Sequence, residues 1–124
     1  MPEVLSPEQI AFYGENGYLV LENRITPMWI DNIRAEIARF EAEAATLNAS
    51  NDRLDLEDTH SPENPRLRRI KLPHMISDVV RELMYSDDLL APARDLIGPD
   101  LRLHTTKLNM KSAGYGAAVE WHQD

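Results

Sequence analysis

The chain has 124 residues, of which 43% are hydrophobic and 27% are charged, a composition typical of a globular domain. Its 21 acidic residues outnumber its 13 basic ones, and the net charge of -8 argues against a nucleic-acid surface, which needs clustered cations. The lack of cysteine excludes disulfides, thiolate metal sites and cysteine nucleophiles. No stretch approaches the ~18 apolar residues of a membrane span, and no signal peptide is visible, so we expect a cytoplasmic protein that binds neither nucleic acid nor membrane.

The front of the chain predicts a helix, a strand and a second helix. Ser6 to Gln9 forms a helix start, because serine caps, proline suits the first turn and glutamine three positions after serine completes a capping box. This helix should end near Gly17, and the β-rich GYLVLEN predicts a strand over 18–22. The second helix should begin at Thr26-Pro27. Its apolar residues recur every three or four positions and predict one core-facing stripe: Ile30, Ile33, Ile37, Phe40, Ala44 and Leu47.

The middle of the chain predicts a loop, a strand and two helices. Residues 48–65 are polar and lack helical periodicity, so they predict a long surface loop. RLRRIKL predicts a short strand over 67–72, closed by Pro73. Apolar spacing between 77 and 97 predicts two consecutive helices that break near Ser86.

The rear of the chain predicts two strands joined by a glycine-containing loop. LRLHTTKLNMK alternates its side chains and predicts a strand over 101–111. After SAGYGA, the segment 119–124 predicts a further strand that carries His122 and Asp124. Residues two apart on a strand share a face, so these two side chains can reach one metal ion. An imidazole and a carboxylate are two of the three ligands of the 2-His-1-carboxylate triad, which leaves one face of Fe(II) open. The H-x-D motif is short and arises by chance, so a plain polar pair at a strand end remains the alternative.

The stretch LRLHTTKLNMKSAGYGAAVEWHQD resembles the phytanoyl-CoA dioxygenase family of Fe(II)/2-oxoglutarate oxygenases. In that family a strand of this type, a glycine-containing loop and an H-x-D strand follow in this order. FYGENGYLVLEN, RRIKLPH and LIGPDL are similar to earlier parts of the family, so the resemblance covers essentially the whole chain.

The resemblance implies an α+β fold in which N-terminal helices pack on part of a double-stranded β-helix, or jelly roll. Residues 1–100 would form the helical and strand front of a single oxygenase domain, and 101–124 its first jelly-roll strands. It also implies that His122 and Asp124 bind Fe(II) and that 2-oxoglutarate chelates the metal as cosubstrate. Members of the family couple the decarboxylation of 2-oxoglutarate to hydroxylation of a small molecule.

Two lysines and an asparagine are candidates for binding the cosubstrate. Lys107 and Asn109 share a strand face by alternation, opposite Leu108, and Lys107 can meet an anion if that face is the barrel interior. Lys71, in RRIKLP, is a second candidate for a carboxylate contact. The alternative for each lysine is a solvent-facing surface side chain. Of the other candidates, His74 lines the site or caps a helix, and His60 is expected to be solvated in its loop.

The sequence departs from the family pattern because part of the expected ligand set and of the expected strands is missing. The family's distal histidine ligand and the arginine that binds the far carboxylate of 2-oxoglutarate lie downstream of the H-x-D strand, and this sequence has neither. A jelly roll needs about eight strands, whereas the sequence predicts about four. We therefore expect an oxygenase truncated after its first metal-ligand strand and inactive by itself, or a site that a partner chain completes. The exposed sheet edge favours a homodimer. The alternative function is a non-catalytic association module with a vestigial metal site.

Overall fold

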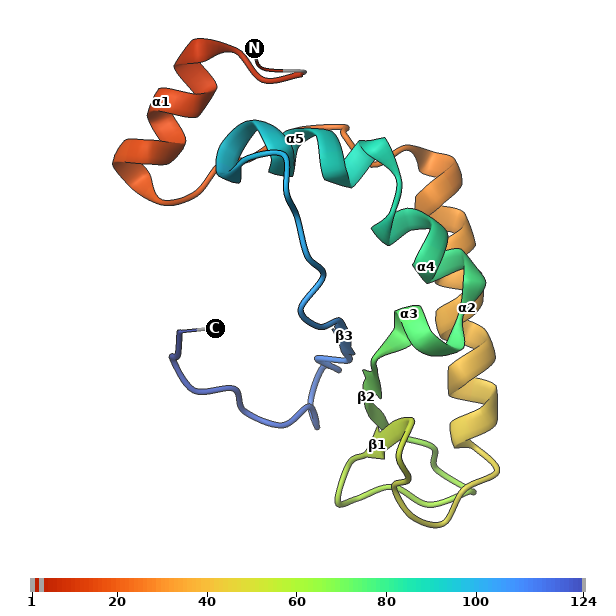
Figure 1. The fold of residues 1–124 in the computed structure, drawn as a ribbon. Helices are drawn as coiled ribbons and strands as arrows, with labels where there is room; N and C mark the ends of the chain where they lie inside the picture. Colours follow the sequence, from red (N-terminus) through yellow and green to blue (C-terminus); the bar gives the residue numbers. More distant parts are fainter. Residues whose placement is uncertain (1, 3, 124) are drawn as a thin grey trace.

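The computed structural model describes residue 2 and residues 4–123 and shows an α+β fold (Figure 1). The helices line an open arch, with a small sheet at one end and the first helix at the other, and the C-terminal segment runs inside this arch. None of the helices in the described part of the chain is long and apolar enough to cross a membrane. In chain order the elements are α1 (Pro7–Asn16), α2 (Pro27–Ala44), β1 (Leu54–Leu56), β2 (Leu67–Lys71), α3 (Pro73–Ile76), α4 (Asp78–Met84), α5 (Asp87–Ile97) and β3 (Lys107–Asn109).

The helix boundaries follow the capping chemistry of the sequence. Ser6 Oγ accepts a hydrogen bond from the Gln9 backbone N–H, and Gln9 Oε1 accepts one from the Ser6 N–H, so the predicted capping box is present. α1 ends at Gly17, whose φ of 79° is in the left-handed region that glycine adopts without strain. The predicted break between two rear helices is also confirmed, because Ser86 stands between α4 and α5.

The sheet is antiparallel in the order β1-β2-β3. Asp55 pairs with Arg69 and Leu56 with Leu67, so Arg68 is an extra residue on β2. This bulge breaks strict alternation and lets Leu67 and Ile70, three positions apart, both be buried.

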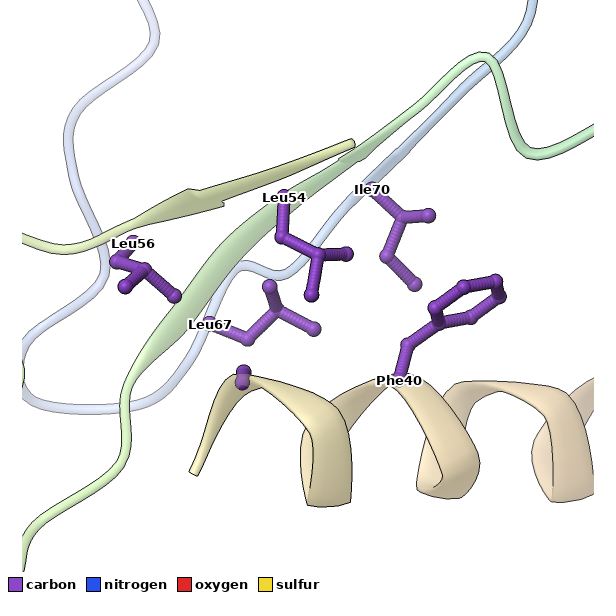
Figure 2. Packing of buried hydrophobic residues seen from close by; sticks show 6 residues of the cluster. Phe40, Leu54, Leu56, Leu67 and Ile70 are labelled. Atoms are coloured by element: carbon purple, nitrogen blue, oxygen red, sulfur yellow. The ribbon is translucent and has the colours of Figure 1, made fainter. Parts of the chain in front are cut away.

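One face of the sheet packs against α2 and forms the main core (Figure 2). Phe40 points from α2 toward the strand leucines and Ile70, and it is fully buried. Ala44, one turn further along the same stripe, is fully buried too, whereas the other predicted stripe residues are less buried. Ile30 is 39% exposed, because only the second half of α2 lies over the sheet. Six buried side chains make up the cluster: Phe40, Ala44, Leu54, Leu56, Leu67 and Ile70.

Several predicted strand assignments are wrong. Residues 18–22 form no strand, and Tyr18 and Val20 are exposed, because no segment of the described sheet lies beside them to complete a ladder. The predicted strand over 101–111 is confined to 107–109, where β2 is available as a partner. Residues 119–123 form no strand, and residue 124 lies outside the described part of the chain. Conversely, the predicted surface loop over 48–65 contains β1, whose two leucines are buried.

Candidate functional site

The face of the sheet that turns away from α2 is polar and carries the three predicted cosubstrate residues. β2 and β3 are in a register that pairs Lys71 with Lys107 and Arg69 with Asn109. Leu108, between Lys107 and Asn109, packs on the hydrophobic core, so its two neighbours face the other way. The structure therefore brings Lys71, Lys107 and Asn109 together on one surface.

Hydrogen bonds and ion pairs order this polar face. Asp55, on β1, forms two ion pairs: its Oδ1 lies 3.0 Å from Lys71 Nζ, and its Oδ2 lies 3.7 Å from Arg69 Nη1. Arg69 Nε donates to Asn109 Oδ1 at 3.0 Å, which orients the amide so that its NH₂ group points away from the arginine. Lys71, Arg69, Lys107 and Asp55 together have a formal charge of +2, in a chain whose net charge is -8.

Two charged residues on this face, Arg69 and Asp55, are not among the candidates that the sequence predicts. Arg69 precedes Lys71 by two positions on one strand, and that spacing is the signal that places both on one face. Asp55 was missed because its strand, β1, lies in a segment that the sequence predicts to be a loop. The alternation of Leu54 and Leu56 around Asp55 is the signal that identifies this short strand.

The segment that leads to His122 returns to the same end of the sheet. Ala117 and Val119 line a cavity of about 30 Å³ together with Glu57, Arg69 and Asn109. A cavity of this size holds about one water molecule. The chain just before the H-x-D motif therefore lies against the polar face at Asn109.

His122 is exposed, and its Nδ1 lies 2.8 Å from the carbonyl oxygen of Glu120. When Nδ1 donates to that carbonyl, Nε2 carries the lone pair that a metal accepts. The predicted partner ligand, Asp124, lies outside the described residues. Within residues 4–123 the structure gathers no group of three histidine, aspartate and glutamate side chains that could hold a metal ion. An imidazole with a carboxylate is nevertheless a donor set that suits Fe(II).

Two of the other three histidines, His60 and His74, have structural partners. His60, predicted to be solvated, is half-buried: its Nδ1 accepts the Arg66 backbone N–H at 2.9 Å, and its Nε2 lies 2.8 Å from the Leu47 carbonyl oxygen. It thus joins the end of the α2 region to the 57–66 loop. His74 lies in α3, with Nδ1 2.5 Å from Thr106 Oγ1. His104 is exposed.

Comparison with known proteins identifies the family. A family model described as phytanoyl-CoA dioxygenase matches residues 13–124. A probable alpha-ketoglutarate-dependent hypophosphite dioxygenase of Stutzerimonas stutzeri is 29% identical over 117 residues, which cover 94% of this chain and 41% of that protein. The ectoine dioxygenase of Nocardia farcinica is 28% identical over 117 residues, 94% of this chain and 37% of the relative. The chain thus spans about two fifths of the length of the curated relatives it matches. Because the family model matches most of the sequence, the chain belongs to the phytanoyl-CoA dioxygenase family.

Proposed function

We propose that this protein is an Fe(II)- and 2-oxoglutarate-dependent dioxygenase that hydroxylates a small molecule. The observation that carries the proposal is the polar sheet face, where Lys71, Lys107 and Asn109 lie together and where Asn109 meets the segment that leads to His122. A surface on which three cations stand beside one carboxylate suits a dicarboxylate such as 2-oxoglutarate. Relatives named as dioxygenases, one of them alpha-ketoglutarate-dependent, support the same reaction class.

The metal would be held by His122 and Asp124. His122 would bind through Nε2, since Nδ1 is directed at the Glu120 carbonyl. When bound, Fe(II) and 2-oxoglutarate supply the oxidising chemistry, and the protein supplies binding, orientation and protection from water. We infer that the site also needs a further metal ligand and a cation for the far carboxylate, supplied by other residues of the same polypeptide or by a second copy paired through the sheet edge.

The cosubstrate would be held mainly by Lys107 and Asn109. Lys71 already forms an ion pair with Asp55, whereas no ion pair of Lys107 is formed within the described residues, so its ammonium can meet a carboxylate. The amide of Asn109 would donate a second hydrogen bond, because Arg69 Nε occupies its oxygen. Lys71 would add positive charge from the adjacent strand.

The substrate that we propose is a small polar molecule. The named relatives act on ectoine and on hypophosphite, which differ in chemistry but are both small and polar. These two compounds are therefore the first members of a substrate panel.

Succinate production tests the proposal. The protein, expressed as its gene encodes it, is supplied with Fe(II), 2-oxoglutarate and the substrate panel. We expect substrate-stimulated succinate formation that falls to background in His122→Ala and in Asp124→Ala, because each substitution removes a metal ligand. His104→Ala is the matched control, since this exposed histidine lies in the same part of the chain. Failure of the wild type to form succinate while it forms a stable dimer without iron affinity would instead favour an association module.

A further inference from the structure

Between β3 and His122 the chain forms a tight turn, and the residue that follows the turn, Ala117, is held by hydrogen bonds. The Gly116 N–H donates to the Ser112 carbonyl oxygen at 2.9 Å, which closes the turn. A side chain at Gly116 would place its Cβ 2.6 Å from that oxygen, so only glycine fits there. The turn therefore delivers Ala117 to a defined place against the sheet.

Both backbone polar groups of Ala117 are bound by charged side chains. Its N–H donates to Glu57 Oε1 at 3.2 Å, and its carbonyl oxygen accepts from Lys111 Nζ. Glu57 lies in the chain just after β1 and is only 8% exposed. A buried carboxylate is costly unless it has a hydrogen-bond donor, so this contact holds both partners in place.

A second contact, between Arg66 and Tyr115, also joins the 57–66 loop to the 115–117 turn. The Arg66 guanidinium stacks over the Tyr115 ring with Cζ 4.2 Å from the ring centroid. Arg66 is itself fixed, because Nη1 donates to Thr59 Oγ1 at 2.7 Å and its backbone N–H donates to His60. The 57–66 loop is therefore braced internally and contacts the 115–117 turn at two points.

We propose that Glu57 and Arg66 are positioning residues for the segment that carries His122. The inference rests on the proposed function, because the segment matters for chemistry only if His122 binds a metal. His122 follows Ala117 by five residues, and Ala117 and Val119 lie against Asn109 on the polar face. When Ala117 is fixed, the His122 imidazole can take fewer positions relative to the cosubstrate side chains of the polar face. A purely structural contact would stabilise the loop without any effect on metal binding.

Amide exchange and metal binding, measured on the protein as its gene encodes it, test the inference. Glu57→Leu removes the acceptor of the Ala117 N–H, whereas Glu57→Gln keeps an acceptor oxygen at the same position. Glu63→Leu is the control, because Glu63 is exposed in the same loop. Hydrogen exchange at Ala117 reports the contact without any metal, and titration with Co²⁺, a redox-stable substitute for Fe(II), reports the site.

We expect Glu57→Leu to exchange the Ala117 amide at least about tenfold faster and to weaken Co²⁺ binding about tenfold, since groups that orient a ligand typically matter by about 10- to 100-fold. Glu57→Gln and Glu63→Leu should stay within about twofold of the wild type in both measurements. Unchanged exchange in Glu57→Leu would overturn the contact, and faster exchange with unchanged Co²⁺ affinity would overturn the positioning role.

The exposed ring of Tyr115 gives a second variant that does not depend on a buried group. Tyr115→Ala removes the surface on which Arg66 stacks, and Tyr115→Phe retains it. We expect weaker Co²⁺ binding only in Tyr115→Ala; equal affinities in both variants would overturn the role of Arg66. If the wild-type protein binds no Co²⁺ at all, the proposed function itself fails, while the exchange rates still decide whether the contact exists.

Discussion

At the residue scale, the two lysines of the polar face differ in their surroundings. Lys71 Nζ lies 3.0 Å from Asp55, so part of its charge is neutralised within the protein. Lys107, its cross-strand neighbour, forms no ion pair with any residue that the structure describes. An incoming carboxylate must compete with Asp55 for Lys71 but not for Lys107, so the two lysines should contribute unequally to cosubstrate binding.

Replacement of each lysine by methionine measures this difference. We expect Lys107→Met to raise the KM for 2-oxoglutarate about tenfold or more, because it removes a charge-assisted hydrogen bond. Lys71→Met should have a smaller effect, about threefold. Initial rates at varied 2-oxoglutarate give both values, and Arg34→Met, at an exposed position of α2, is a control for net charge. Equal effects of Lys71 and Lys107 would contradict the proposed geometry.

Phe40 should be a major contributor to stability. Its ring is fully buried among strand side chains (Figure 2). The ring also lies under the Arg39 guanidinium, with Cζ 4.3 Å from the ring centroid. We expect Phe40→Ala to lower the free energy of unfolding by about 3–5 kcal/mol, from lost burial and a residual cavity. Phe12→Ala, at a ring 40% exposed, should cost about 1 kcal/mol. Chemical denaturation measures both, and similar losses would contradict the position assigned to the core.

Glu36 should make stability depend on acid pH. Hydrogen bonds from Arg39 and from the Ser77 hydroxyl hold the pKa of the Glu36 carboxyl below its ordinary value of 4.5. A lowered folded-state pKa means that the ionised carboxylate stabilises the fold above pH 4.5, and that this stabilisation is lost as the pH falls through the folded-state pKa.

The stability difference between wild type and Glu36→Gln should therefore shrink as the pH falls from above 4.5 through the lowered pKa of folded Glu36. Denaturant unfolding across this range measures the difference. Glu41→Gln, at an exposed position of the same helix, is the control and should show no such trend. A difference that stays constant with pH would show that Glu36 is not stabilised as a carboxylate.

At the scale of elements, the helices follow local sequence chemistry, while the strands depend on partners. Capping residues and proline predicted the starts of α1 and α2, because a helix satisfies its hydrogen bonds within one segment. A strand needs a neighbour, so the β-rich residues 18–22 remain outside the sheet and the short LDL segment of β1 joins it. The bulge at Arg68 cannot be predicted from alternation, because it depends on the register with β1.

The starts of α1 and α2 offer a matched test of capping. Ser6 Oγ accepts the Gln9 N–H at 3.2 Å, whereas Thr26 makes no side-chain cap hydrogen bond at the start of α2. We expect Ser6→Ala to destabilise the protein by about 1 kcal/mol and Thr26→Ala by less than about 0.5 kcal/mol. Thermal or denaturant unfolding measures both values. An equal cost would contradict the capping box as the source of the stability of α1.

At the scale of the whole molecule, α2 covers the apolar face of the sheet and leaves the polar face toward the inside of the arch, where the C-terminal segment runs (Figure 1). The sequence predicted that Lys107 and Asn109 share a face, because strand periodicity decides it, and β3 has this geometry. It did not predict the contact between Glu57 and Ala117 beside Asn109, since that contact joins residues 60 positions apart. Long-range contacts of this kind depend on the turn at Gly116, not on local pattern.

The measurement that tests the account most directly is calorimetric titration of 2-oxoglutarate into the protein, as its gene encodes it, with and without Fe(II) under anaerobic conditions. If His122, Asp124 and the polar sheet face form one site, the wild type should bind 2-oxoglutarate tightly only with Fe(II) present. His122→Ala should lose this metal-dependent binding, and Lys107→Met should weaken it. Binding of equal strength with and without Fe(II), or unchanged in His122→Ala, would contradict a shared site.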